Sequence, residues 1–114
     1  MAKPAAAACN LECRYCYYLH RAEAKPSRRM SREVLEAFIR DTIGAQAGAP
    51  EIAFSWQGGE PLLAGLDFFR DVVALQAHYA PQGVRIQNSL QTNATLIDEN
   101  WAGFLAGQRF LVGV

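Results

Sequence analysis

The sequence has 114 residues, 51% hydrophobic and 19% charged, which is typical of one small globular domain and excludes a disordered chain. Eleven basic residues balance eleven acidic ones, so no field of one sign predicts binding to nucleic acid or to an anionic membrane. The apolar stretches are far shorter than the ~20 residues of a membrane span, and residues 1–8 lack the apolar centre of a signal peptide, so we expect a cytoplasmic protein without a nucleic-acid or membrane partner.

The first predicted feature is a loop that holds all three cysteines of the chain. Cys9, Cys13 and Cys16 lie within eight residues with the spacing C-x3-C-x2-C. An iron–sulfur cluster takes thiolate ligands, so a loop that curls three sulfurs toward one centre can fill three corners of a [4Fe–4S] cluster. The fourth iron would stay open, and an open coordination position is where a metal site does chemistry. The spacing therefore predicts an iron–sulfur loop.

Two other interpretations of these cysteines stay open at this point. A structural zinc site would need His20 or His78 to complete its ligands, and C-x3-C-x2-C-x3-H is an unusual spacing for zinc. A disulfide framework fits less well, because three is an odd number and no secretory signal precedes the loop.

Helices and strands alternate along the rest of the chain. Residues 17–30 are predicted to be the end of the cysteine loop and a connection, and Ser31 is predicted to cap a helix that ends at Gly44, with Met30 and Leu35 as a hydrophobic staple. Its buried face is predicted to consist of Val34, Leu35, Phe38, Ile39 and Ile43. Further elements follow in order: a strand over 51–56, a helix over 65–80, a strand over 84–90, a helix over 99–106 capped by Asp98, and a strand over 110–114.

This alternation predicts the α/β class, with βαβ units and a parallel sheet whose polar strand ends gather on one rim. Both ends of the chain depart from a complete sheet. The last strand is an apolar run without a cap, and Lys3-Pro4 before the cysteines cannot form a convincing central strand. Because a parallel sheet needs covered faces and protected edges, we expect a fragment of a longer enzyme.

A second motif, Gln57-Gly58-Gly59-Glu60-Pro61, follows the first predicted strand. Glycines at a strand end let a ligand approach the backbone closely, and a carboxylate just beyond them can accept hydrogen bonds from an amine. The alternative is a plain Gly-Gly turn with a solvated glutamate.

The two motifs, in this order and at this distance, resemble the signatures of the radical S-adenosylmethionine (SAM) enzymes. A longer set of matches resembles the N-terminal part of the anaerobic sulfatase-maturating enzymes: Lys3-Pro4, residues 9–19, Met30-Ser31, residues 54–63, Gln91-Thr92-Asn93 and residues 95–98. The resemblance covers essentially the whole chain. It implies that SAM binds the open iron, that an electron from the cluster breaks a carbon–sulfur bond, and that the resulting 5′-deoxyadenosyl radical abstracts hydrogen from the substrate. In this family a Cys or Ser of an unfolded sulfatase is thereby oxidised to Cα-formylglycine.

The resemblance also implies a fold and a set of partners. The fold is part of a (β/α)6 partial barrel truncated at both ends, in which residues 1–114 are the N-terminal portion of the radical SAM domain. The first strand is nearly absent, and the later βα units and the C-terminal auxiliary-cluster domain are missing, so the fragment alone is expected to be inactive. The implied partners are an unfolded sulfatase and an electron donor such as ferredoxin or flavodoxin.

The site residues implied by the resemblance fall into three groups. The cluster ligands are Cys9, Cys13 and Cys16. The residues at SAM are Tyr15 near the adenine, Gly58, Gly59 and Glu60 at the amino group, and Asn93. The residues near the substrate peptide are Tyr18 and Gln57. Simple packing is the alternative for Tyr18, and capping of the strand exit is the alternative for Asn93.

Two other functions stay open. The chain could belong to another peptide-modifying radical SAM enzyme, for example one that acts on a ribosomally made precursor. It could also be a non-catalytic metal-binding or electron-transfer module.

Overall fold

The structure is a computed structural model that describes residues 1–18 and 29–114. In chain order the elements are α2 (Arg32–Ala45), β1 (Glu51–Trp56), the 3-10 helix η1 (Pro61–Ala64), α3 (Leu66–Tyr79), β2 (Arg85–Gln91), α4 (Glu99–Gly107) and β3 (Leu111–Gly113). The predicted elements are all confirmed to within two residues at each end, whereas η1 was not predicted. In the described part of the chain, no helix combines the length and the apolar character that crossing a membrane requires. His20, the possible zinc ligand, lies outside the described residues.

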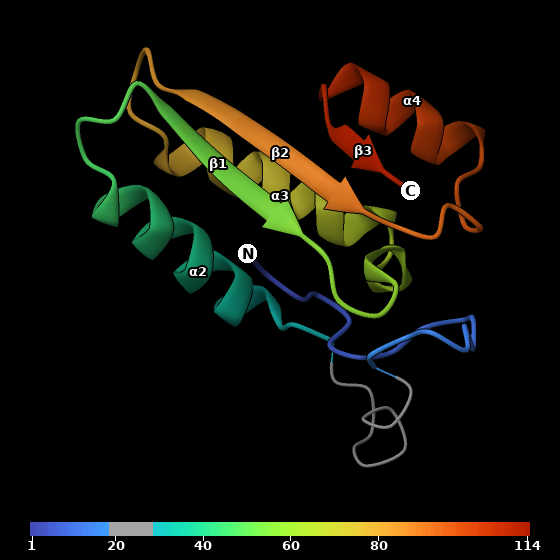
Figure 1. The fold of residues 1–114 in the computed structure, drawn as a ribbon. Helices are drawn as coiled ribbons and strands as arrows, with labels where there is room; N and C mark the ends of the chain where they lie inside the picture. Colours follow the sequence, from blue (N-terminus) through green and yellow to red (C-terminus); the bar gives the residue numbers. More distant parts are fainter. Residues whose placement is uncertain (19–28) are drawn as a thin grey trace.

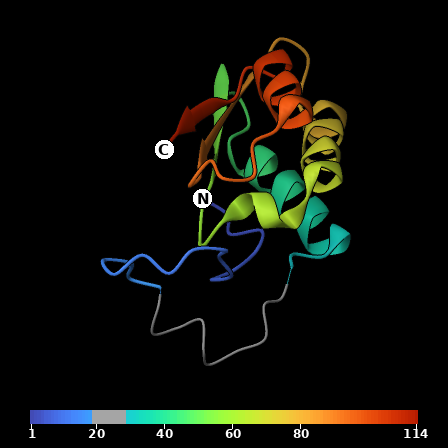
Figure 2. The ribbon, with the colours of Figure 1, turned by 90° about the vertical axis from the view of Figure 1, so that its right-hand side faces the viewer.

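The strands of the described residues form one parallel sheet in the order β1-β2-β3. Figures 1 and 2 show that α2, α3 and α4 all lie on the same face of this sheet. Beyond the outer edge of β1, Ala2 forms a single parallel bridge with Trp56. Among the described residues no strand precedes β1, in agreement with the expectation that Lys3-Pro4 would not form a central strand. The α/β class and the partial parallel sheet are therefore confirmed.

Helix α2 begins where its sequence predicts. The hydroxyl of Ser31 accepts a hydrogen bond from the Val34 amide at 3.3 Å, which satisfies one of the free N–H groups of the first turn. Leu35, Ile39 and Ile43 face the core, as predicted. Val34 does not, because 55% of its surface is exposed. It lies one position before Leu35, about 100° around the helix from the buried stripe.

The core between the sheet and the helices is rich in aromatic rings. Phe54 and Trp56 point from β1 toward the helices and stack with their ring centroids 6.2 Å apart. Phe69 of α3 meets Trp56 edge to face at 5.9 Å, and it meets Trp101 of α4 in the same way at 5.5 Å. Edge-to-face contacts of this kind are favourable beyond the area that they bury. They join β1, α3 and α4 around the ring of Phe69.

A buried polar cluster sits inside this apolar layer. The Asn88 side-chain oxygen accepts hydrogen bonds from the Trp56 indole N–H and from the Gln76 amide, both at 2.9 Å, and the Asn88 amide donates to the Gln76 oxygen at 2.8 Å. All three side chains are almost fully buried. Because a buried polar group is costly unless it is paired, this closed set of bonds fixes β1, β2 and α3 in one register.

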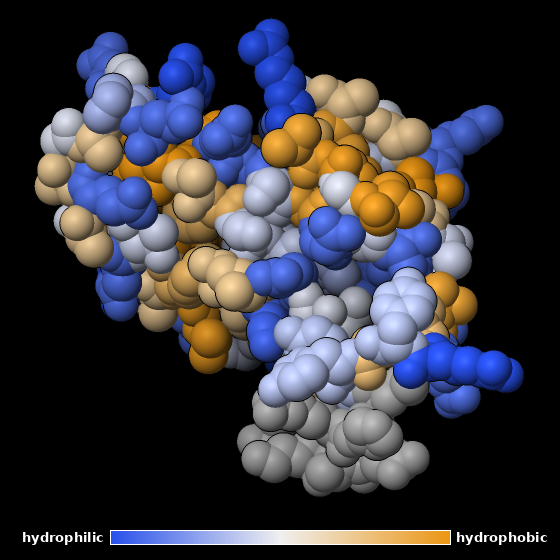
Figure 3. Space-filling view, in the orientation of Figure 1, coloured by the Kyte–Doolittle hydropathy of each residue, from blue (hydrophilic) through white to orange (hydrophobic). Residues whose placement is uncertain are grey.

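The other face of the sheet carries no helix from the described residues (Figure 2). Its side chains are the alternate residues of the strands, among them Ser55, Ser89 and Gln91. Figure 3 looks onto this face, where the surface over the middle of the sheet is pale to blue and an orange patch lies over β3 and the C-terminus. Leu111 and Val114 belong to this patch and are 65% and 85% exposed.

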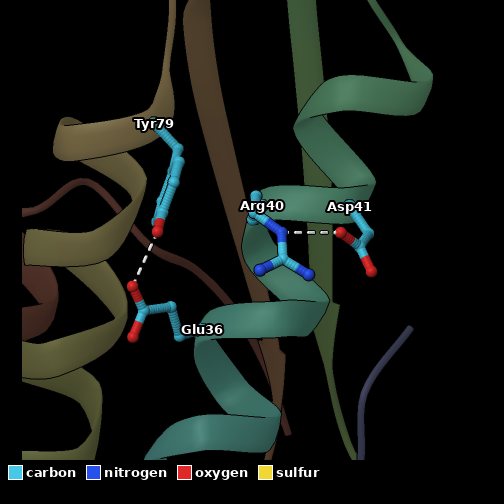
Figure 4. Close-up of polar contacts among 4 residues, drawn as sticks. All are labelled: Glu36, Arg40, Asp41 and Tyr79. Carbon is cyan, nitrogen blue, oxygen red and sulfur yellow. Dashed lines mark hydrogen bonds and ion pairs between the residues drawn. The ribbon is translucent and has the colours of Figure 1, made fainter.

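Helices α2 and α3 are also joined by a polar contact, drawn in Figure 4. The Tyr79 hydroxyl donates a hydrogen bond of 2.6 Å to the Glu36 carboxylate, while Arg40 pairs with Asp41 at 2.9 Å on the exposed side of α2. The hydrogen bond to Glu36 raises the pKa of Tyr79, with burial as a second cause, because both favour the neutral phenol.

This contact predicts an alkaline loss of stability. Since the folded pKa of Tyr79 lies above its unfolded value, the contribution is complete below about pH 10 and is lost as the pH rises through the folded pKa. The free energy of unfolding of the wild type should fall toward that of Tyr79→Phe over this range, as measured by urea unfolding from about pH 8 to about pH 12. A difference between the two proteins that stays constant with pH would contradict the assignment.

Candidate cofactor site

The cysteine loop lies beyond the carboxyl ends of β1 and β2, below both arrowheads in Figure 1. Its three thiols are free, with Cys9 exposed and Cys13 and Cys16 half-buried. A turn closes the loop, since the Cys16 amide donates to the Cys13 carbonyl at 2.8 Å. No disulfide joins these three cysteines in the structure, as their odd number led us to expect.

Backbone amides point at two of these sulfurs. The Leu11 N–H donates to Cys9 Sγ at 3.5 Å, and the Tyr18 N–H donates to Cys16 Sγ at 3.4 Å. The thiolate is the form of cysteine that binds iron, and a thiolate sulfur can accept hydrogen bonds from amides placed in this way. In residues 1–18 and 29–114, no three Cys, His, Asp or Glu side chains are arranged around one metal ion.

The Gly58-Gly59 turn binds the segment that leads into this loop. The Gly59 amide donates to the Ala6 carbonyl at 3.0 Å, and the Glu60 amide donates to the Ala8 carbonyl at 2.7 Å. A Cβ on Gly59 would lie 2.1 Å from the Ala8 oxygen, which is closer than any real contact. Gly58 has φ +133°, a value that favours glycine. Here the backbone that approaches the glycines is the chain's own segment before Cys9.

Glu60 connects the segment that follows β1 to the segment that follows β2. Its side chain is fully buried, so it is not a solvated turn residue. One carboxylate oxygen accepts from the Leu62 amide at 2.9 Å and from the Thr92 hydroxyl at 2.7 Å, and the other accepts from the Asn93 amide at 2.8 Å. These donors are all neutral, and none of the ion pairs formed by the described residues includes Glu60. A carboxylate has about four acceptor positions, so these three donors leave one position unfilled.

Asn93 continues the chain of contacts from Glu60 to the cysteines. Its side-chain amide donates to Asn10 Oδ1 at 2.9 Å and lies 3.7 Å from Cys9 Sγ. Its oxygen accepts from the backbone amide of Thr95 at 3.0 Å and from the Thr95 hydroxyl at 2.7 Å. The end of β2 is thus bound directly to the cysteine loop, 84 residues away in sequence.

The remaining predicted residues are spread around this rim. Gln57 lines an open groove of about 400 Å³ on the uncovered face of the sheet, with Ser55, Ser89 and Gln91. Tyr18 is half-buried and is not among the lining residues of this groove; the Lys3 ammonium lies 4.8 Å from its ring centre. Tyr15 is 92% exposed. The structure therefore brings Cys9, Glu60 and Asn93 together and leaves Tyr15 on the surface.

Comparison with known proteins decides the family. The profile of the radical SAM superfamily matches residues 5–114. The chain belongs to the radical SAM superfamily.

Several well-described proteins of the superfamily are similar to this chain. The serine-type anaerobic sulfatase-maturating enzyme of Klebsiella pneumoniae is 55% identical over 98% of this chain and 28% of its own length. The cysteine-type enzyme of Clostridium perfringens is 44% identical, with 98% and 30% covered. A solved structure described as native anSMEcpe with bound AdoMet is 46% identical to this chain and has a TM-score of 0.88. The match covers 98% of this chain and 30% of that chain. The chain thus spans less than a third of the length of these relatives.

Membership of the radical SAM superfamily implies a [4Fe–4S] cluster and SAM as cofactors, as the cysteine spacing and the resemblance predicted. The donor set fits the cluster, because three free thiols lie on one loop and two of them already accept amide hydrogen bonds. The membership favours a cluster over the zinc alternative, which depended on His20 or His78. His78 is exposed on α3, one residue before its end.

Sequence reasoning missed three residues of the rim. Asn10, Thr92 and Thr95 all take part in the hydrogen bonds that join the cysteine loop to the exits of β1 and β2. In the sequence they are polar residues after Cys9 and after the second predicted strand, and they lie within the segments that resemble the sulfatase-maturating enzymes, without a role of their own. This pattern does not indicate that the two segments meet.

Proposed function

We propose that this chain is the cofactor-binding portion of an enzyme that reductively cleaves SAM at a [4Fe–4S] cluster and oxidises a Cys or Ser of a sulfatase to Cα-formylglycine. The observation that carries the proposal is the continuous set of contacts from the three-cysteine loop through Asn93 to the buried Glu60. The similarity to serine-type and cysteine-type sulfatase-maturating enzymes supports the reaction class and the substrate class.

In this proposal each group of residues has its own task. The cluster is held by Cys9, Cys13 and Cys16 and supplies one electron. SAM supplies the radical that abstracts hydrogen from the substrate. Gly58, Gly59, Glu60, Asn93 and Tyr15 hold SAM, and the acceptor position left on Glu60 suits an ammonium group. Tyr18 and Gln57 lie nearest to the substrate peptide, and the open groove beside Gln57 supports the role of Gln57.

The proposal extends to the whole protein. Residues 1–114 form the N-terminal portion of a longer radical SAM domain, followed by further βα units and an auxiliary-cluster domain; the share of each relative that the chain spans supports this. The substrate is an unfolded sulfatase polypeptide, and the electron donor is a small redox protein such as ferredoxin or flavodoxin. The enzyme works in the cytoplasm without nucleic acid or membrane.

The test is turnover by the full-length protein, reconstituted with iron and sulfide without oxygen. With dithionite, SAM and a peptide that carries the target Cys or Ser of a sulfatase, we expect 5′-deoxyadenosine together with an aldehyde on the peptide, both measured by mass spectrometry. A ribosomal precursor peptide serves as the comparison substrate. Formation of 5′-deoxyadenosine without any aldehyde on either sulfatase peptide would overturn the substrate assignment, and failure to form it at all would overturn the reaction class.

A further inference from the structure

The contact between Asn93 and Cys9 points to a role that differs from SAM binding. We propose that the Asn93 side-chain amide is a hydrogen-bond donor to the Cys9 thiolate, and that this bond raises the reduction potential of the cluster. Asn93 is then a positioning and tuning residue for the cluster. The proposal rests on the proposed function, because it needs a cluster on Cys9.

The orientation of the Asn93 amide follows from its partners. The oxygen is occupied by two donors, the backbone amide and the hydroxyl of Thr95. If the amide were turned over, its NH₂ group would face the Thr95 N–H, and two donors would oppose each other. The nitrogen therefore faces Asn10 Oδ1 and Cys9 Sγ, at 2.9 Å and 3.7 Å. An amide nitrogen has two hydrogens, so it can serve both acceptors.

The orientation is reinforced by a closed ring of hydrogen bonds. Asn93 donates to Asn10, the Asn10 amide donates to the Thr95 hydroxyl at 2.8 Å, and that hydroxyl donates back to Asn93. Each group gives and receives with the correct polarity. The backbone of Asn93 is held separately, because its N–H donates to the buried Glu60 carboxylate. The side chain facing Cys9 is thus fixed from both sides.

The effect on the cluster has a defined sign. Hydrogen bonds to the sulfurs are among the factors that set the potential of an iron–sulfur cluster. Reduction adds negative charge, part of which lies on the thiolate ligands, and a donor at Cys9 Sγ stabilises that charge. Removing the donor should therefore make reduction harder and lower the potential. A negative charge at the same place should lower it further.

The experiment is an EPR-monitored redox titration of the reconstituted full-length protein without SAM, so that SAM affinity does not enter. Asn93→Leu keeps the size and removes the donor. Asn93→Asp keeps the acceptor for Thr95 and places a charge toward Cys9. Asn10→Ala is the matched control, because it breaks the ring but leaves the donor to Cys9. Iron content per chain is measured for all four proteins.

We expect a negative shift of the midpoint potential in Asn93→Leu, a larger negative shift in Asn93→Asp, and a smaller shift than either in Asn10→Ala, where Thr95 still holds the Asn93 oxygen. If Asn93→Leu does not retain its cluster, Asn93→Asp carries the test. Wild-type potentials in the Asn93 variants, or an equal shift in Asn10→Ala, would overturn the proposal. Loss of the cluster from both Asn93 variants would overturn it as well, since the side chain would then serve assembly. A wild-type protein that binds no [4Fe–4S] cluster would instead overturn the proposed function.

Discussion

Replacement of Cys13 by alanine is expected to abolish the cluster completely. In the proposed site each thiolate of the loop would bind a different iron and the fourth iron would have no protein ligand, so a loop with two thiolates would bind only two of the four irons. The Cys13 carbonyl, which accepts the Cys16 amide at 2.8 Å, is kept in Cys13→Ala. The substitution therefore removes the thiol and leaves the turn. Iron and sulfide analysis after anaerobic reconstitution should give wild-type values for the parent protein and values near zero for the variant.

Arg14→Ala is the matched control for this experiment. Arg14 is exposed, lies between Cys13 and Cys16, and carries no thiol. Its replacement should leave the iron and sulfide content and the brown colour unchanged. A full cluster in Cys13→Ala would remove Cys13 from the ligand set. A wild-type protein that stays colourless and binds zinc would favour the zinc interpretation.

Replacement of Glu60 is expected to have the second largest effect, and it should affect both stability and SAM binding. In Glu60→Ala, the Leu62 amide, the Thr92 hydroxyl and the Asn93 amide lose their acceptor inside the protein. An unsatisfied buried donor costs about 1–3 kcal/mol, so the free energy of unfolding should fall by at least about 3 kcal/mol. This is a large part of the roughly 5–15 kcal/mol that stabilises a typical domain.

SAM affinity should fall in the molecules of this variant that remain folded. A hydrogen bond to a charged group contributes about 1.5–3 kcal/mol, which corresponds to a loss of roughly 10- to 150-fold. In the proposed site SAM would also coordinate the open iron, to which Glu60 is not a ligand, so SAM binding should be weakened and the cluster retained. Urea unfolding measures the first effect, and a SAM titration followed by perturbation of the cluster EPR signal measures the second.

Two further variants separate the two effects. Thr92→Val removes one of the donors to Glu60 and keeps the carboxylate, so it should lose less stability than Glu60→Ala. Glu60→Gln keeps the size but replaces one acceptor oxygen by a donor, which must face either the Asn93 amide or the Leu62 and Thr92 donors. It should therefore lie between the other two in stability. A Glu60→Ala protein as stable as the wild type would contradict the buried role, and unchanged SAM affinity would contradict the cofactor role.

Local sequence patterns were sufficient to predict the helices, the strands and the family, because the signals for these are local or lie in short motifs. Apolar residues recur at helical or strand spacing, and Ser31 and Asp98 cap the helices that follow them. The sequence predicts less reliably which positions at the edge of a helical stripe are buried, because this depends on what packs against the helix. Val34 was predicted to be buried but is exposed. The four residues of η1 are too few for a period to appear.

The contacts between the motifs became visible only in the folded chain. From the sequence, Gly58 and Gly59 were predicted to lie next to a ligand. In the structure the backbone of Ala6 and Ala8 packs against this turn. Glu60 could be either solvated or functional until its partners, 32 and 33 residues away, were seen to bury it. The contact of Asn93 with Cys9 joins residues 84 positions apart. Such contacts form because the parallel sheet brings the carboxyl ends of separate strands to one rim. A local sequence pattern does not indicate which distant residues meet there.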